Sequence, residues 1–239
     1  MLLLKVIGSI LGLLIVLAVL FFAALVIVNL PRKDKPIAGK RIIACIGDSI
    51  TFGTGVAWHR HRDAWPYLLA KQLGNGYQVL NYGISGATLQ NAGNAPYRKH
   101  GFLEAAKDSS PETVFFMLGT NDSKPYNWNA KQYEKELTEL LEELKATPSQ
   151  PQIYVMTPPF AAPAKGKDTV AFDIRNEVIR DEIRPTIQYQ AQKHQVSLID
   201  LYGITAEHPE YYSDGVHPNQ LGNQVIANCI YENLKRNAD

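Results

Sequence analysis

The chain has 239 residues and a formal net charge of +1 at pH 7, so no strong electrostatic attraction to nucleic acid is expected. About 200 residues remain after an apolar N-terminal segment, which is enough for one globular domain with a sizeable core. The two cysteines, Cys45 and Cys229, are too few for a disulfide framework, and both are expected to be small buried side chains.

The first predicted element is an apolar helix at the N-terminus. Residues 6–30 carry no charged side chain and are mostly Leu, Ile, Val, Ala and Phe. Roughly 25 such residues can cross a bilayer as a tilted helix. Residues 1–30 are therefore interpreted as a retained membrane anchor, with a cleaved signal sequence as the alternative. A linker over 31–39 and a globular domain over 40–239 follow.

Beyond residue 40, apolar runs typical of strands alternate with helical patterns. The predicted strands cover 41–46, 79–82, 113–118, 153–156 and 196–201. The predicted helices cover 65–73, 130–146, 172–194 and 219–235, with Asp63 as the first N-cap, a kink at Pro185, and Leu221, Val225, Cys229 and Ile230 facing inward on the last. This alternation predicts an α/β fold with a parallel sheet and helices on both faces.

A serine stands where the first predicted strand ends. Ser49 follows Gly47 and Asp48, and in open α/β sheets ligands bind beyond the carboxyl ends of the strands. Thr51 occupies the position where a G-x-S-x-G elbow requires glycine, so this is not that motif. We expect Ser49 to be a nucleophile and Asp48 to brace the turn through backbone N–H groups.

A serine nucleophile needs a base and an orienting group, and Asp214 and His217 can supply them. Gly215 allows a tight turn on which the carboxylate reaches the imidazole, and His217 then presents its other nitrogen to Ser49. The alternative is a turn-capping Asp and a His packed beside Pro218. That alternative is common for an isolated Asp-x-x-His, but much less so beside the serine loop.

Three donors are candidates for an oxyanion hole. They are the backbone N–H groups of Ser49 and Gly86 and the side-chain amide of Asn121, which follows a predicted buried strand. Taken alone, Gly86 could simply serve a positive φ, and Asn121 could form an Asx turn.

Together these segments resemble the four sequence blocks of the SGNH (GDSL-type) hydrolases. The matching residues are Gly47-Asp48-Ser49, Ser85-Gly86, Gly119-Thr120-Asn121-Asp122 and Asp214-Gly215-Val216-His217-Pro218. The resemblance covers nearly all of the globular domain. It implies a flavodoxin-like three-layer α/β/α sandwich with five strands in the order 2-1-3-4-5. It also implies ester hydrolysis by Ser49, His217 and Asp214 without a metal or cofactor.

The substrate is indicated less directly. Residues 119–128 are similar to the same stretch in family members that act on acetylated carbohydrates, and Trp58, Tyr126 and Trp128 could form an aromatic rim for a sugar. The alternative is that these aromatics only pack within the protein. We expect a carbohydrate O-acetylesterase or short-chain esterase whose partner is a small-molecule or glycan ester. A lysophospholipase or thioesterase, and a membrane-tethered binding module without catalysis, are the other hypotheses.

Two further expectations concern metals and membrane orientation. His59 and His61 have no nearby carboxylate or cysteine cluster to complete a metal site, so none is expected. Arg32, Lys33 and Lys35 follow the apolar segment, and the positive-inside rule alone would keep the domain in the cytoplasm. The family resemblance favours the outer face instead, and an extracytoplasmic domain is expected. The oligomeric state is left open.

Overall fold

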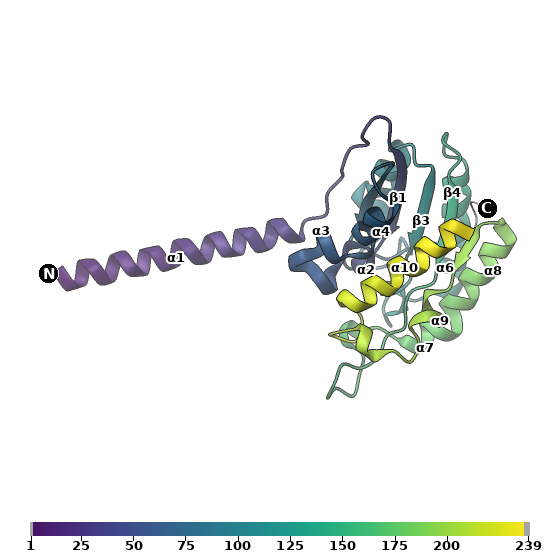
Figure 1. Ribbon diagram of the computed structural model, residues 1–239. Helices are drawn as coiled ribbons and strands as arrows, with labels where there is room; N and C mark the ends of the chain where they lie inside the picture. Colours follow the sequence, from purple (N-terminus) through teal and green to yellow (C-terminus); the bar gives the residue numbers. More distant parts are fainter. Residues whose placement is uncertain (1, 237–239) are drawn as a thin grey trace. The chain divides into compact units, whose positions relative to one another are not determined.

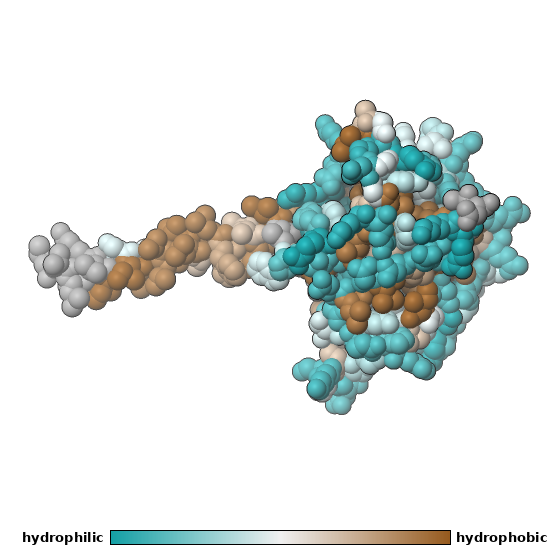
Figure 2. Space-filling model, viewed as in Figure 1, coloured by the Kyte–Doolittle hydropathy of each residue, from teal (hydrophilic) through white to brown (hydrophobic). Residues whose placement is uncertain are grey.

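The computed structural model describes residues 2–236, and the chain divides into two compact units between Leu30 and Pro31. The first unit is helix α1 (Leu2–Asn29). Within it, Ile7–Ile27 has a mean hydropathy of 3.3 over 21 residues, enough to cross a bilayer by length and composition. Figure 2 shows apolar side chains along most of this helix. Such a helix fits a membrane anchor and a signal sequence alike.

The second unit is built on a parallel sheet of five strands in the order β2-β1-β3-β4-β5. Figure 1 labels β1, β3 and β4 of this sheet. The strands are β1 (Arg41–Gly47), β2 (Tyr77–Gly83), β3 (Thr113–Met117), β4 (Gln152–Met156) and β5 (Ser197–Ile199). The parallel sheet and its predicted order are both confirmed. The central strands are buried on both faces, which explains their nearly continuous apolar sequences.

Helices cover both faces of the sheet and complete three layers. On β1, Ile42, Ala44 and Ile46 face one core, and Ile43 and Cys45 face the other. The first core is closed by α5 (Phe102–Asp108), α6 (Ala130–Lys145) and α8 (Arg184–His194), and the second by α4 (Trp65–Leu73) and α10 (Gln220–Arg236). The predicted α/β/α sandwich is therefore confirmed.

Short helical segments join these elements. They are α2 (Ser49–Phe52), η1 (Thr54–His59), α3 (Arg60–Asp63), η2 (Tyr97–His100), η3 (Asn121–Ser123), η4 (Ala171–Asp173), α7 (Asn176–Val178), η5 (Ile179–Ile183), α9 (Leu201–Thr205) and η6 (Pro209–Tyr211). Most lie in the loops that follow strands. The predicted helix over 172–194 includes α7 and η5, whereas the sequence patterns predicted none of the other short segments and also missed α5.

The predicted helix over 172–194 is wrong only in its first four residues, because helical structure runs from Asn176 to His194. Phe172 and Asp173 adopt left-handed backbone angles, with φ values of 62° and 58°, so no helix passes through them. Regular α8 begins at Arg184, after a π-helical turn at Ile179–Ile183. Pro185 directly follows this π-helical turn, inside helical structure that continues from Asn176 to His194. The helix is therefore irregular beside Pro185, and the predicted kink itself stays a prediction.

Two predicted helix details are also wrong. Asp63 does not cap α4, because its carboxylate accepts two hydrogen bonds from Arg62, and Ala64 occupies the N-cap without a side-chain bond. On α10, Leu221 is exposed, whereas Ile226 lies in the core. Ile230 is buried as predicted, and Cys229 packs against the same core while partly buried, whereas Val225 is only half-buried.

The last strand is shorter than predicted because Asp200 begins a helix. Its side chain accepts a hydrogen bond from the backbone N–H of Gly203 and caps α9. The two cysteines are free, as expected; Cys45 is fully buried and Cys229 is partly buried.

Candidate active site

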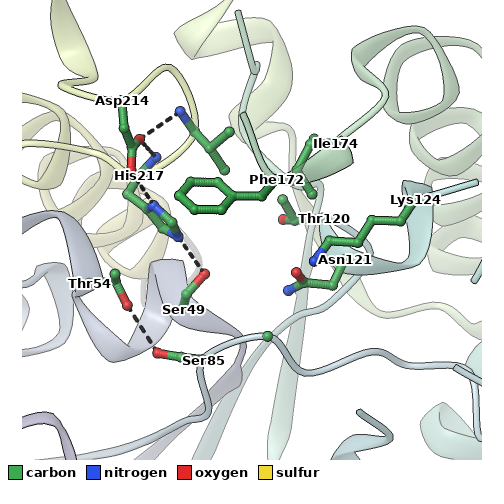
Figure 3. Close-up of a pocket in the computed structure, with 12 residues that line it drawn as sticks. Ser49, Thr54, Ser85, Thr120, Asn121, Lys124, Phe172, Ile174, Asp214 and His217 are labelled. Carbon is green, nitrogen blue, oxygen red and sulfur yellow. Dashed lines mark hydrogen bonds and ion pairs between the residues drawn. The ribbon is translucent and has the colours of Figure 1, made fainter. Parts of the chain in front are cut away.

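A cavity of about 240 Å³ lies beyond the carboxyl ends of the central strands. The residues predicted to carry the chemistry all line it: Ser49, Gly86, Asn121, Asp214 and His217. Figure 3 shows the side chains of Ser49, Asn121, Asp214 and His217 converging from separate loops. The parallel topology explains this gathering, because β1, β2 and β3 end at the same edge of the sheet.

Ser49 is held by a tight turn between β1 and α2. The Oδ1 atom of Asp48 accepts a hydrogen bond from the backbone N–H of Ile50 at 2.9 Å and caps α2, which confirms the predicted bracing. At Gly47 a Cβ atom would collide with the Thr51 side chain, so the turn needs glycine there. The serine is thereby fixed at the strand end and is 5% exposed.

Ser49, His217 and Asp214 form one hydrogen-bonded line (Figure 3). The Ser49 Oγ atom lies 2.9 Å from Nε2 of His217, and Nδ1 of the same ring lies 2.6 Å from Oδ2 of Asp214. An ionised carboxylate only accepts hydrogen bonds, so the ring proton belongs on Nδ1. Nε2 is then free to accept the serine hydroxyl, which is the arrangement a general base requires.

The Asp214 carboxylate stays ionised because N–H groups of its own turn donate hydrogen bonds to it. Burial alone would raise its pKa, but hydrogen bonds from the His217 ring and from the backbone N–H groups of His217 and Val216 lower the pKa to about 2. The two backbone bonds reach Oδ1 at 2.7 and 3.0 Å. Asp214 therefore presents a full negative charge to the imidazole at neutral pH.

Gly86 and Asn121 both line the cavity, and their role as oxyanion donors stays a prediction. Gly86 has a φ of 81°, and no heavy atom lies within 4 Å of the position where its Cβ would be, so a substrate atom can approach its backbone closely. The amide nitrogen of Asn121 donates to the carbonyl of Ala87 at 3.2 Å. An amide nitrogen carries two N–H donors, so one remains for a ligand.

Two buried carboxyl groups, those of Asp48 and Asp122, support the loops that carry Ser49 and Gly86. Asp122 accepts hydrogen bonds from the backbone N–H groups of Leu89 and Gln90, each at 2.9 Å, and so anchors the loop that carries Gly86. Burial raises the pKa of Asp122 and of Asp48 to about 6. The sequence marked Asp122 as part of a block but did not indicate this anchoring role.

Four further residues line the cavity and were not singled out from the sequence: Thr54, Lys124, Phe172 and Ile174. The Phe172 ring meets the His217 ring edge-on, with centroids 5.2 Å apart. No local pattern marks Phe172, since a helix was expected there. Lys124 lies within the stretch similar to carbohydrate esterases, and its position after Asn121 was the available signal.

The three predicted rim aromatics do not line the catalytic cavity. Trp58 is 60% exposed and lines a neighbouring hollow, which shares Thr54 with that cavity. Tyr126 is exposed, and Trp128 donates from Nε1 to Glu182 at 3.0 Å. Their role in substrate binding stays a prediction. Within residues 2–236 no group of three or more His, Cys, Asp or Glu side chains is arranged to hold a metal ion.

Comparison with known proteins gives a family match and a sequence relative. Residues 45–225 match the model of the GDSL-like Lipase/Acylhydrolase family. An acetylxylan esterase from Xylanibacter ruminicola is 32% identical over 213 residues. The match covers 81% of this chain and 43% of that protein, so the chain spans less than half the length of the relative.

Solved structures share the fold at low sequence identity. A carbohydrate acetylesterase from Sinorhizobium meliloti superposes with a TM-score of 0.68 at 21% identity, and covers 82% of this chain and 99% of its own. The aryl esterase of M. smegmatis gives the same TM-score, identity and coverage. A lipase/acylhydrolase from Enterococcus faecalis gives 0.66 at 21% identity, with 82% and 96% coverage.

Proposed function

Because most of its length matches the family model, the chain belongs to the GDSL-like lipase/acylhydrolase family of carboxylic ester hydrolases, and we propose that it removes acetyl or other short acyl groups from a carbohydrate. The observation that carries the proposal is the contact between Ser49 Oγ and His217 Nε2 inside a cavity that Gly86 and Asn121 also line. The names of the acetylxylan esterase and carbohydrate acetylesterase relatives support the choice of acyl group and substrate class.

In the proposed reaction, Ser49 attacks the ester carbonyl while His217 takes its proton at Nε2. Asp214 holds the ring in the required tautomer and stabilises the imidazolium that forms. His217 then returns the proton to the departing sugar hydroxyl, and an acyl-enzyme remains on Ser49. Water, deprotonated by the same imidazole, releases the acid and restores the serine.

Charge develops on the carbonyl oxygen in both steps. The backbone N–H groups of Ser49 and Gly86 and the free amide N–H of Asn121 are the proposed donors to it. They are fixed before the substrate arrives: Gly86 by the loop anchored on Asp122, and Asn121 by its bond to Ala87. Donors that need no reorganisation stabilise the transition state most effectively.

The cavity size supports a short acyl group. Its volume of about 240 Å³ lies below the roughly 300–1,000 Å³ of pockets that enclose drug-sized ligands. A long acyl chain would extend over the surface, which disfavours the lysophospholipase or thioesterase alternative. The hollow beside Trp58 adjoins the cavity at Thr54 and offers room for further sugar residues.

The apolar helix α1 bears on where in the cell the domain would act. We propose that Ile7–Ile27 is a retained membrane anchor and that the domain lies on the extracytoplasmic side of the membrane, where it would encounter glycan esters. Protease treatment of intact cells tests this orientation. Digestion of the domain without lysis supports it, and protection until lysis contradicts it.

Acetate release from acetylated xylan by the full-length chain tests the activity. Turnover of p-nitrophenyl acetate should exceed that of the palmitate ester, and Ser49→Ala should abolish both acetate-releasing reactions. Ser213→Ala is the matched control, because Ser213 is exposed beside Asp214 and lies outside the cavity lining. Preference for palmitate would replace the proposal with the lipid alternative, and equal turnover by Ser49→Ala would remove the proposed nucleophile.

A further inference from the structure

The catalytic cavity contains a positive charge that the proposed acyl transfer does not use. Lys124 is half-buried and lines the cavity, and Figure 3 shows its ammonium end directed toward the Asn121 side chain. Within residues 2–236, no carboxylate lies within the 4.0 Å that defines an ion pair with it. A partly desolvated ammonium group without a partner has an unmet need for an anion.

The backbone of Lys124 is fixed by a braced turn. Its carbonyl accepts hydrogen bonds from the backbone N–H groups of Asn127 and Trp128, at 3.0 and 3.1 Å. The Asn127 side chain also donates to the carbonyl of Asn121 at 2.8 Å, and the Trp128 indole is tied to Glu182. The turn therefore presents the amide of Asn121 and the ammonium group of Lys124 to the same cavity.

The surrounding charges compensate Lys124 only at a distance. Burial lowers the pKa of Lys124, and Asp173 and Asp48 oppose that shift through longer-range attraction. Asp173 is exposed on the η4 turn, and burial raises the pKa of Asp48. An anionic group bound in the cavity would supply the short-range partner that these residues do not.

We propose that Lys124 forms an anion subsite, and that the preferred substrates are esters with a carboxylate close to the scissile bond. The carboxylate could belong to the acyl group or to the alcohol, for example an acidic sugar. This inference rests on the proposed ester hydrolysis and narrows its substrate class. A neutral acetyl ester alone would leave the ammonium group unpaired, since three other donors already face the carbonyl oxygen.

Matched pairs of esters test the subsite on each side of the bond. 4-Acetoxybenzoate against its methyl ester places the carboxylate on the leaving group, and monomethyl against dimethyl succinate places it on the acyl group. For at least one pair, the full-length chain should favour the charged ester in kcat/KM by about tenfold, as expected for one charge-assisted contact. Lys124→Met should bring that ratio close to one, and Lys124→Arg should retain it.

Lys131→Met is the matched control, because Lys131 is an exposed lysine in the first turn of α6 and lies outside the cavity lining. It should leave the ratio unchanged. A wild-type ratio near one for both pairs would overturn the inference. So would a Lys124→Met variant that loses activity equally on charged and neutral esters, since that result assigns Lys124 to oxyanion stabilisation or to folding.

A binding measurement keeps this inference separate from the proposed function. In the Ser49→Ala background, calorimetry of 4-acetoxybenzoate and of monomethyl succinate should show at least one of them binding about tenfold more weakly after Lys124→Met. If Lys124→Met leaves the affinity for both ligands unchanged, the proposed subsite is overturned. If the wild type hydrolyses none of the esters but this binding difference is found, the proposed hydrolysis fails and the subsite stands.

Discussion

The cavity has two walls that are built in different ways. The strand-end wall, made by Ser49, Gly86 and Asn121, follows strands β1, β2 and β3 within a few residues. The loop wall, made by Phe172 and Ile174, lies in a long irregular segment after β4. The sheet holds the first wall in place, whereas the second depends on contacts between loops. Under the proposed function, the strand ends position the nucleophile and the oxyanion donors, whereas the long loop positions Phe172 against His217.

Among the substitutions that test the two walls separately, Asn121→Ala should produce the largest effect on activity. Loss of one preorganised oxyanion donor typically lowers kcat by about 10²–10³-fold, while KM changes little. Steady-state kinetics on p-nitrophenyl acetate measure both constants. Asn129→Ala is the matched control: Asn129 caps α6 on the same segment, so its loss should cost about 1 kcal/mol of stability and leave kcat intact. A kcat within a few-fold of wild type for Asn121→Ala would contradict the strand-end wall's proposed role.

The same contrast explains what the sequence could predict. Ser49 and Asn121 stand next to apolar strand runs, so local pattern and parallel topology together bring them to one edge. Phe172 has a φ of 62°, which its local sequence disfavours and which tertiary contacts must maintain. Local periodicity therefore predicted a helix there. The position of Lys124 soon after Asn121 indicated that it lies near the cavity, but its place in the cavity lining depends on the turn held by Asn127, which no local pattern indicated.

Asp48→Asn should change how stability depends on pH, because the strand-end wall buries this carboxyl group fully. Its folded pKa of about 6 exceeds the ordinary value of 3.8, so the folded chain binds the extra proton. Its favourable contribution is complete below about pH 4 and disappears as the pH rises through about 6. The asparagine oxygen can still accept a hydrogen bond from the backbone N–H of Ile50. The fall in unfolding free energy with rising pH should therefore be smaller in the variant than in the wild type, by up to roughly 3 kcal/mol.

Urea unfolding across this pH range measures the change. Asp122 has a similarly raised pKa, so part of the slope should remain in Asp48→Asn. Asp173→Asn, at an exposed residue next to the loop wall, is the control and should leave the pH dependence as it is. Equal destabilisation of Asp48→Asn at every pH would show that the residue acts only as a cap.

Phe172→Ala should give the smallest effect and should act on binding. Phe172 lines the cavity, so loss of its ring should remove a contact with the substrate worth about 0.5–1.5 kcal/mol; KM should then rise by roughly two- to tenfold with kcat nearly unchanged. Tyr189→Ala is a suitable control, because Tyr189 is 56% exposed against 54% for Phe172 but lies outside the cavity lining. A loss of kcat comparable to that of Asn121→Ala would erase the distinction between the walls.

The activation of Ser49 by His217 can be measured directly with a fluorophosphonate probe, because only an activated serine reacts with it readily. Intact-protein mass spectrometry and peptide mapping should find one adduct per chain, on Ser49. In His217→Ala the labelling rate should fall by at least about a thousandfold. Adducts on another residue, or Ser49 labelling that proceeds at the same rate without His217, would contradict the proposed catalytic centre.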